Sequence, residues 1–370
     1  MSNAPSKPVS FSRPKVGYFS NRPRKLWGWA EELHLTADEI TNKLFLAVDR
    51  DGNSAIYWAA CTDSLELLET LWGLFKETQL NLDDLSKLLF AALQEAAARG
   101  YIEILERLWL CAGEVQINTH ELRRRLLLDK NKDGESAWLM AVAGSHIEVI
   151  EKLWSWAKPV QIQADDIRSD MLLAQDKNGK TAWHLAVTNG RVRVLKKLLD
   201  SANEIQLNPG EIRNLLLDQE ENAWFLAAKS GKVKVLEEIW VLAKEKRTTE
   251  EIKSKLLLAQ NEYGQTALHL VAEGSVEVLQ KLWALAKEAQ LNQDELENKL
   301  LLAKDKSVYT AWLRTAEGGS SKSLEMLWNC AKEAELNRDE LKNKLLLAQN
   351  EEGETAWHLA AEGNNEAILQ

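Results

Sequence analysis

Residues 259–302, AQNEYGQTALHLVAEGSVEVLQKLWALAKEAQLNQDELENKLLL, contain the unit that decides the fold. We interpret this stretch as a turn followed by three helices. Residues 261–264 form the turn, because Gly264 can adopt the positive φ that a tight turn requires. Thr266 begins a first helix that ends near Gly274. A second helix is predicted over residues 276–289, because its apolar residues recur at three- and four-residue spacing.

A third helix is predicted from a capping signal. Asn292 is placed to cap it, and Glu295, three residues later, completes a capping box. The same cap-x-x-Glu spacing recurs at three other pairs: Thr36/Glu39, Thr248/Glu251 and Asn337/Glu340. Asn208 is followed by Pro209, a residue suited to the first position of a helix. The apolar residues 296, 300 and 303 form one stripe, so the third helix is amphipathic.

Tryptophan shows that this unit is repeated. In one register it follows Ala, at Trp138, Trp183, Trp224, Trp312 and Trp357, with Leu268 in the same slot. In the other it follows Leu or Ile, at Trp72, Trp109, Trp154, Trp240, Trp283 and Trp328, with Leu199 in the same slot. Neighbours in the first register are 41 to 45 residues apart, and the two marks within a unit are 15 or 16 apart. Two interleaved marks with one period indicate a repeated supersecondary unit.

The domain organisation follows from this period. Residues 1–24 hold four of the six prolines, several serines and no periodicity, and are predicted to be a flexible basic tail. Residues 25–370 are predicted to form one solenoid, with a half repeat at 25–47, about seven repeats over 48–347 and a truncated repeat at 348–370. The unit after Ser86 lacks a turn motif. The chain stops at Gln370 without a polar capping repeat, so we expect that the sequence is truncated there.

Charge and cysteine content exclude several classes of protein. The net charge is −10, although residues 1–25 carry six basic residues and no acidic ones, so the remainder carries −16. An array this acidic should repel nucleic acid phosphates. No apolar run is long enough to span a bilayer, and no secretory signal is present. Cys61, Cys111 and Cys330 are widely spaced and odd in number, which argues against disulfides or a zinc site and favours a reducing compartment.

The first two helices of the unit resemble ankyrin repeats. The family pattern is D-x-x-G-x-T-P-L-H-x-A-A, followed by a glycine turn and a second helix that ends in paired leucines. Residues 176–186, DKNGKTAWHLA, and residues 350–361, NEEGETAWHLAA, follow this pattern. Ala replaces the family's Pro, and Trp replaces a Leu in both helices. The period is about 44 rather than 33 residues, and the third helix accounts for the surplus.

The resemblance implies an all-α, right-stacked solenoid of ankyrin-like repeats, with three helices per repeat and short turns or vestigial β-hairpins. It also implies that His184, His269 and His358 hydrogen-bond the turns. The glycine of the turn is missing at Val308 and around Glu220–Glu221, so those turns are expected to differ. We predict that nine tryptophans form the repeat core: Trp138, Trp154, Trp183, Trp224, Trp240, Trp283, Trp312, Trp328 and Trp357.

Several other interpretations carry less weight. The three histidines are about 85–90 residues apart, whereas metal ligands must converge on one small sphere. Residues 129–134, DKNKDG, resemble the start of a calcium loop, but Met140 stands where the bidentate carboxylate should be. The tryptophans could form a stacking platform for a ligand, although their helical register indicates core. Residues 22–25, RPRK, could be a nuclear localisation signal or an electrostatic anchor rather than part of a solvated tail.

The turns vary while their frame stays constant, as a modular binding surface requires. The candidate partner-binding residues are Lys177, Asn178, Lys180, Glu262, Tyr263, Gln265, Lys306, Ser307, Tyr309, Glu351, Glu352 and Glu354. They could instead be solvated turns under no constraint.

The sequence therefore predicts a protein-binding scaffold or adaptor that recognises a partner protein through its turns and a concave first-helix surface. The partner has a basic face. No metal, cofactor, nucleic acid or membrane span is expected, and no catalytic motif is present. Two alternatives stay open: a substrate-recruiting or regulatory arm of a longer enzyme or channel, and a structural spacer without a specific ligand. The expected location is the cytoplasm, with the nucleus as the alternative.

Overall fold

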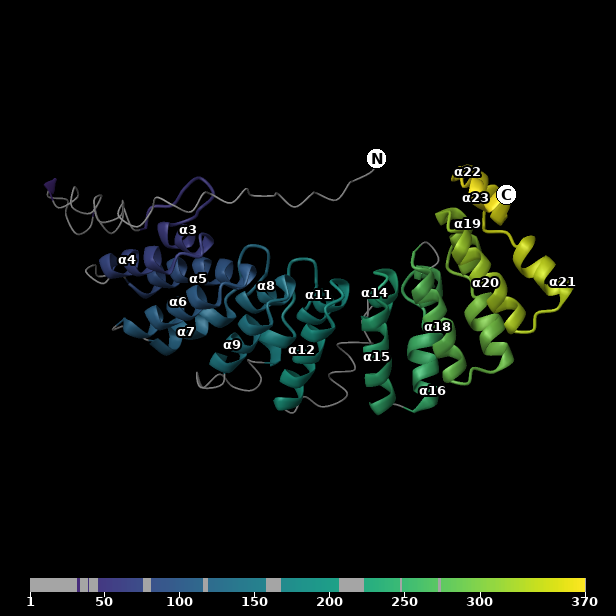
Figure 1. Ribbon diagram of the computed structural model, residues 1–370, viewed down its shortest axis with the longest axis horizontal. Coiled ribbons are helices and arrows are strands. Elements are labelled where there is room, and N and C mark those ends of the chain that lie inside the picture. The colour runs from purple at the N-terminus through teal and green to yellow at the C-terminus, as the bar shows by residue number, and fades with distance from the viewer. Residues whose placement is uncertain are drawn as a thin grey trace. The chain divides into compact units, whose positions relative to one another are not determined.

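In the computed structural model of this chain, short helices lie side by side in chain order within each of two compact units (Figure 1). The structure describes residues 32–33, 39, 46–75, 81–115, 119–157, 168–205, 223–246, 248–271 and 274–369. The chain forms two compact units, unit 1 at Met1–Met171 and unit 2 at Leu172–Gln370. The predicted tail at 1–24, the turn at 220–221 and the Thr36 and Asn208 caps lie outside the described residues. A single solenoid over 25–370 stays a prediction.

Unit 1 stacks helices in two rows, with one more helix packed against both. The first row consists of α3 (Ala55–Cys61), α5 (Leu82–Arg99) and α8 (Ala137–Gly144), and α5 contacts both of the others. The second row consists of α4 (Leu65–Phe75), α6 (Ile102–Glu114) and α9 (Ile147–Ala157). Helix α7 (Thr119–Leu128) packs against both rows. Because α5 runs without a break, it combines a third helix with the next first helix, in the unit that lacks a turn motif. The π-helical turn η2 (Arg168–Leu172) crosses the boundary between the two units.

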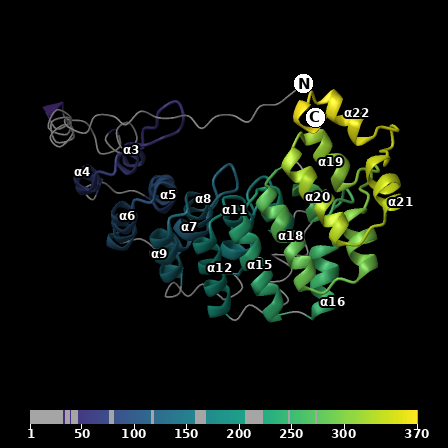
Figure 2. The same ribbon diagram turned by 45° about the vertical axis from the view of Figure 1, so that its right-hand side comes forward.

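Unit 2 repeats the same plan (Figure 2). Its first helices are α11 (Ala182–Thr188), α14 (Ala223–Lys229), α17 (Ala267–Val271), α19 (Ala311–Gly318) and α22 (Ala356–Glu362). Its second helices are α12 (Val192–Glu204), α15 (Val233–Lys246), α18 (Val276–Glu288), α20 (Ser321–Glu333) and α23 (Glu366–Leu369). Each described first helix contacts the next along the chain. The described residues contain no β-strand, so the connections before the first helices are turns.

In unit 2 the third helix is present, but part of it is wound as a π-helix, whereas α7, the third helix of its repeat in unit 1, is α-helical. The segments are α16 (Thr249–Ile252) with η3 (Lys253–Leu257), η4 (Glu295–Leu301), and α21 (Arg338–Glu340) with η5 (Leu341–Leu346). The amide of Leu302 donates to the carbonyl of Glu297, five residues back, at 2.9 Å. Three of the four predicted capping boxes are confirmed, at Thr248/Glu251, Asn292/Glu295 and Asn337/Glu340. The Asn292 amide donates to the Glu295 carboxylate at 2.9 Å, and the Glu295 amide donates to the Asn292 side chain at 3.0 Å.

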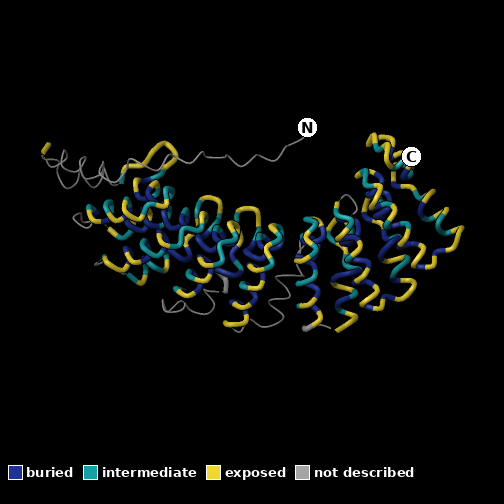
Figure 3. The backbone as a smooth tube through the Cα atoms, in the orientation of Figure 1, coloured by how far each residue is buried: buried dark blue, intermediate teal, exposed yellow. Residues whose placement is uncertain are grey.

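Buried and exposed positions alternate along the helices (Figure 3), and tryptophans are among the largest fully buried side chains. Within a repeat, the tryptophan of the first helix packs on the tryptophan of the second helix: the ring centroids of Trp224 and Trp240 are 6.0 Å apart. The 16-residue spacing thus places one ring on each of two paired helices. The Trp240 indole N–H donates across the repeat boundary to Glu288 at 3.2 Å. Seven of the nine predicted core tryptophans are buried: Trp138, Trp154, Trp183, Trp224, Trp240, Trp283 and Trp312.

The core prediction is wrong for the last repeat. Trp357 is 60% exposed and His358 is exposed, whereas Trp312, in the same slot one repeat earlier, is 5% exposed. Trp328 is only half-buried. The reason is that each repeat buries its face against the next one along the chain: α22 covers α19, whereas no later first helix among the described residues covers α22.

Candidate protein-binding face

The turns share one hydrogen-bonded frame, built on an Asp or Asn side chain. In unit 2, the Asn261 carboxamide oxygen accepts the amides of Tyr263 and Gln265 at 3.0 and 2.9 Å. The amide of residue 261 donates to the carbonyl of Gln265 at 2.9 Å. Asx side chains commonly bond the backbone two residues on in this way. The same frame is built on Asp49, Asn131, Asp176, Asp305 and Asn350.

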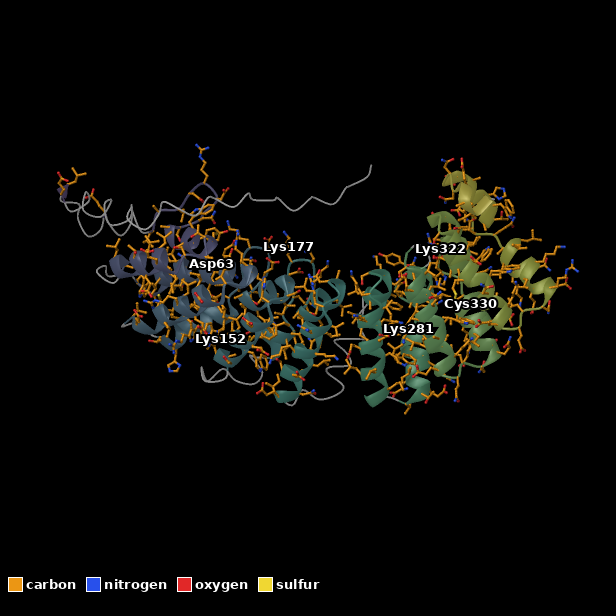
Figure 4. All side chains as sticks on the ribbon, viewed as in Figure 1. Asp63, Lys152, Lys177, Lys281, Lys322 and Cys330 are labelled. Atoms are coloured by element: carbon orange, nitrogen blue, oxygen red, sulfur yellow. The ribbon has the colours of Figure 1, made fainter. Side chains whose placement is uncertain are left out.

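The frame decides which of the predicted binding residues are presented to solvent. The second and third residues of each turn are exposed: Lys177, Asn178, Glu262, Tyr263, Lys306, Ser307, Glu351 and Glu352. Figure 4 shows Lys177 on such a turn. The fifth residues, Lys180, Gln265, Tyr309 and Glu354, are half-buried. Gln265 and Glu354 stabilise their own turns by accepting side-chain hydrogen bonds. The Asn261 side chain donates to Gln265 at 3.2 Å, and the Asn350 side chain donates to Glu354 at 2.8 Å.

Two of the turns, 131–135 and 305–309, are also tied to the preceding first helix. The Thr266 amide donates to His269 Nδ1 at 3.2 Å, so the ring proton lies on Nε2, which donates to the Tyr309 carbonyl of the next turn at 3.2 Å. Burial lowers the pKa of His269, so the ring is neutral near pH 7. Gln94 in α5 makes the equivalent bond to the Glu135 carbonyl at 2.8 Å. Gln94 stands in the unit without a turn motif, so its sequence gave no signal of this role.

A small hollow opens on this side of unit 2, between α14 and the turn at 261–265. Its volume is about 50 Å³, and it is lined by Phe225, Leu226, Lys229, Asn261, Glu262, Tyr263, Gln265 and Leu270. Tyr263 is 59% exposed, while Leu226 and Leu270 are half-buried. Leu185 holds the same position in α11 as these two leucines in their helices, directly after the slot of His184. We name this surface, formed by the turns and these first-helix positions, the turn face of unit 2.

The turn at 305–309 was expected to differ because it lacks glycine, and that expectation is wrong. Val308 adopts φ 62°, in the left-handed region where Gly264 has φ 75°. The Asp305 amide donates to the Tyr309 carbonyl at 2.8 Å, as in the other turns. The Lys306 amide also donates to the Tyr263 carbonyl at 2.9 Å, so the two neighbouring turns are joined directly. The shared frame therefore imposes a conformation that a β-branched residue seldom adopts.

Arg314 is the one cation at its position on the turn face. Leucine stands there in the other described first helices of unit 2, at Leu185, Leu226, Leu270 and Leu359. Arg314 Nη2 lies 2.7 Å from a carboxylate oxygen of Asp305, a residue that is 6% exposed, and its guanidinium lies 4.0 Å above the ring of Tyr309. Burial alone would raise the pKa of Asp305. The hydrogen bonds from Arg314 and from the amides of Tyr309 and Ser307 outweigh it, so this pKa lies below its usual value.

Among the described residues, no group of three or more His, Cys, Asp or Glu side chains is placed to hold a metal ion. None of the helices in the described part of the chain is long and apolar enough to cross a membrane. The exposed turn residues of unit 2 differ in charge and size from one repeat to the next on an identical backbone.

Comparison with known proteins agrees with the fold. Residues 93–211 match the family model for ankyrin repeats, in three copies. The ankyrin repeat domain of human ASB11 aligns with a TM-score of 0.47 at 17% identity, over 75% of this chain and 96% of that one. The structure of the predatory endopeptidase Bd0816 from Bdellovibrio bacteriovorus in complex with the immunity protein Bd3460 gives a TM-score of 0.42 at 20% identity, over 64% and 96%. No curated protein sequence matches the chain.

The predicted resemblance to ankyrin repeats is thus confirmed over residues 93–211, and the fold is all-α as predicted. Ankyrin repeats are generally protein–protein interaction modules, and proteins built from them are typically non-catalytic scaffolds. Neither of the two similar structures bears on the partner of this chain.

Proposed function

We propose that this protein is a non-catalytic scaffold whose unit 2 binds a segment of a partner protein on its turn face. The observation that carries the proposal is Tyr263, which is 59% exposed at the edge of a hollow between two neighbouring repeats. Tyrosine contributes a large, rigid and amphipathic contact area, and such residues dominate binding energy when a partner desolvates them. Leu226 and Leu270 in the same hollow supply apolar surface for a partner side chain.

The charge of the turns supports a partner with a basic face. Glu262 adjoins Tyr263, and the last turn exposes Glu351 and Glu352. Lys306, between them along the chain, is the exposed cation of the intervening turn. Charges at the rim of an interface set association rate and partner choice more than affinity. In this proposal Tyr263 is the anchor, and the acidic turns select the partner.

The other parts of the proposal concern the whole chain. No disulfide joins any two of Cys61, Cys111 and Cys330, which is compatible with the reducing cytoplasm where we propose that the protein acts. We also propose that the repeats of both units form a single array.

The test begins with a pull-down from the organism's own extract, using the full chain. Against the partner recovered, Tyr263→Ala should weaken binding by about ten- to thirtyfold, as expected for a hot-spot residue. Asp51→Ala changes the corresponding turn position in unit 1 and is the matched control, which should bind normally. Unchanged affinity of the Tyr263 variant would refute the anchor. Equal capture at low and high salt would refute the basic face, because exposed charges are screened.

A further inference from the structure

The repeat around the 305–309 turn breaks the pattern of the array in three ways at once. Val308 replaces the glycine that stands at that turn position in the other described turns, at Gly52, Gly134, Gly179, Gly264 and Gly353. Arg314 replaces the leucine of unit 2's other first helices, and its partner Asp305 is a buried carboxylate. These changes meet within one cluster, since Arg314 covers the ring of Tyr309.

Stability does not account for this combination. Holding a non-glycine residue in the left-handed region costs free energy, and more so when it is β-branched. A buried ion pair is often no more stabilising than apolar residues of similar volume. The same array builds an equivalent turn with Asn261, Gly264 and Leu270, without strain or buried charge. The preceding repeat therefore shows a more stable set of residues for the same turn. This indicates that Asp305, Val308 and Arg314 serve recognition rather than stability.

The contacts of Arg314 hold its edges and one flat face, and leave the side chain partly exposed. Its Nε and Nη2 donate to Asp305 Oδ2 at 3.3 and 2.7 Å, and its Nη1 donates to Glu317 at 3.3 Å, so the edges of the guanidinium are held. The ring of Tyr309 covers one flat face at 4.0 Å. The Arg314 side chain nevertheless remains 21% exposed. A planar cation that is held by its edges and by one face can accept a ligand on the opposite face.

We propose that Arg314 is a specificity-determining residue of the turn face, which stacks an aromatic side chain of the bound partner segment on the guanidinium face opposite Tyr309. This inference rests on the proposed function, because it names a second contact on the same face. Guanidinium groups stack well on aromatic rings. An anionic ligand is disfavoured there, since the two carboxylates of Asp305 and Glu317 already outweigh the single positive charge.

The experiment selects a random peptide library, displayed on phage, against the full chain and two variants. Arg314→Lys keeps the charge opposite Asp305 but removes the planar face. The double variant Asp305→Asn, Arg314→Leu restores the residue types found in the preceding repeat. Circular dichroism and hydrogen exchange first establish that both variants are folded. The wild type should enrich peptides with an aromatic residue at one fixed position, and neither variant should.

Individual selected peptides then provide affinities. An aromatic peptide should bind Arg314→Lys about three- to thirtyfold more weakly than wild type, which corresponds to the usual strength of such a stack. A leucine replacement at its aromatic position should remove that difference between the proteins. Wild-type selection without aromatic enrichment, or equal enrichment on Arg314→Lys, would overturn the inference. Peptides that depend on Tyr263 but not on Arg314 would overturn it while leaving the proposed function intact.

Discussion

Replacing Val308 with glycine should stabilise the protein locally, although it removes a half-buried side chain. Val308 has φ 62°, and the left-handed conformation costs an L-residue about 1–2 kcal/mol. Glycine adopts this conformation freely, but it gives the unfolded chain additional entropy worth about 0.4–1 kcal/mol. The difference predicts a net gain of about 0.5–1 kcal/mol for Val308→Gly.

Two glycines of the same array provide controls with the opposite sign. Gly353 has φ 81°, and a Cβ built there meets nothing within 4 Å, so Gly353→Val should lose about the amount that Val308→Gly gains. Gly264 has φ 75°, but its Cβ would lie 3.0 Å from the backbone nitrogen of Lys306. Gly264→Val should therefore cost clearly more, because backbone contact is added to conformational strain.

Native-state hydrogen exchange is the suitable assay, because a change in the stability of one repeat alters the amide protection mainly of that repeat and its neighbours. The amides of Lys306 and Tyr309 report on the turn, since they donate to the Tyr263 carbonyl and the Asp305 carboxylate. A gain of 0.5–1 kcal/mol corresponds to about two- to fivefold slower exchange. Faster exchange in Val308→Gly, with Gly353→Val neutral, would show that the side chain at 308 stabilises the turn more than its conformation costs.

Three further outcomes are expected. Trp240→Ala should cost roughly 3–5 kcal/mol and loosen the adjacent repeats in hydrogen exchange, whereas Trp357→Ala, at a site that is 60% exposed, should change stability little. Because the folded pKa of His269 is lowered, its stabilising contribution is full above about pH 6.5 and declines as pH falls through the folded value. His269→Gln, which copies the bond of Gln94, should remove that dependence in thermal melts between pH 5 and 7. The lowered pKa of Asp305 likewise gives stability that is present above about pH 4 and lost as pH falls through the folded value, and Asp305→Asn should abolish this acid-induced loosening of the turn.

What the sequence determined by itself is local in the chain. The capping pair Asn292 and Glu295 is three residues apart, and the Asn261–Gly264 turn closes within five, so neighbouring residues suffice to specify both. The 16-residue spacing of the tryptophans predicted paired helices, because helix length and turn length fix where the second ring falls. The third helix was predicted from its local capping signal, but the sequence did not predict its π-helical winding.

The features that only the tertiary structure decided depend on contacts with residues of a neighbouring repeat. Trp312 and Trp357 occupy the same slot in nearly the same sequence, yet one is buried and the other 60% exposed, because burial depends on the following repeat. Val308 was expected to alter its turn. The Val308 amide nevertheless donates to the Asp305 carbonyl, and the Lys306 amide donates to the Tyr263 carbonyl, so the turn keeps the conformation that glycine adopts elsewhere. From the sequence alone, Arg314 would be predicted to be an ordinary surface charge. Its packing on Tyr309 and its pairing with buried Asp305 exist only once the turn has folded back over the helix.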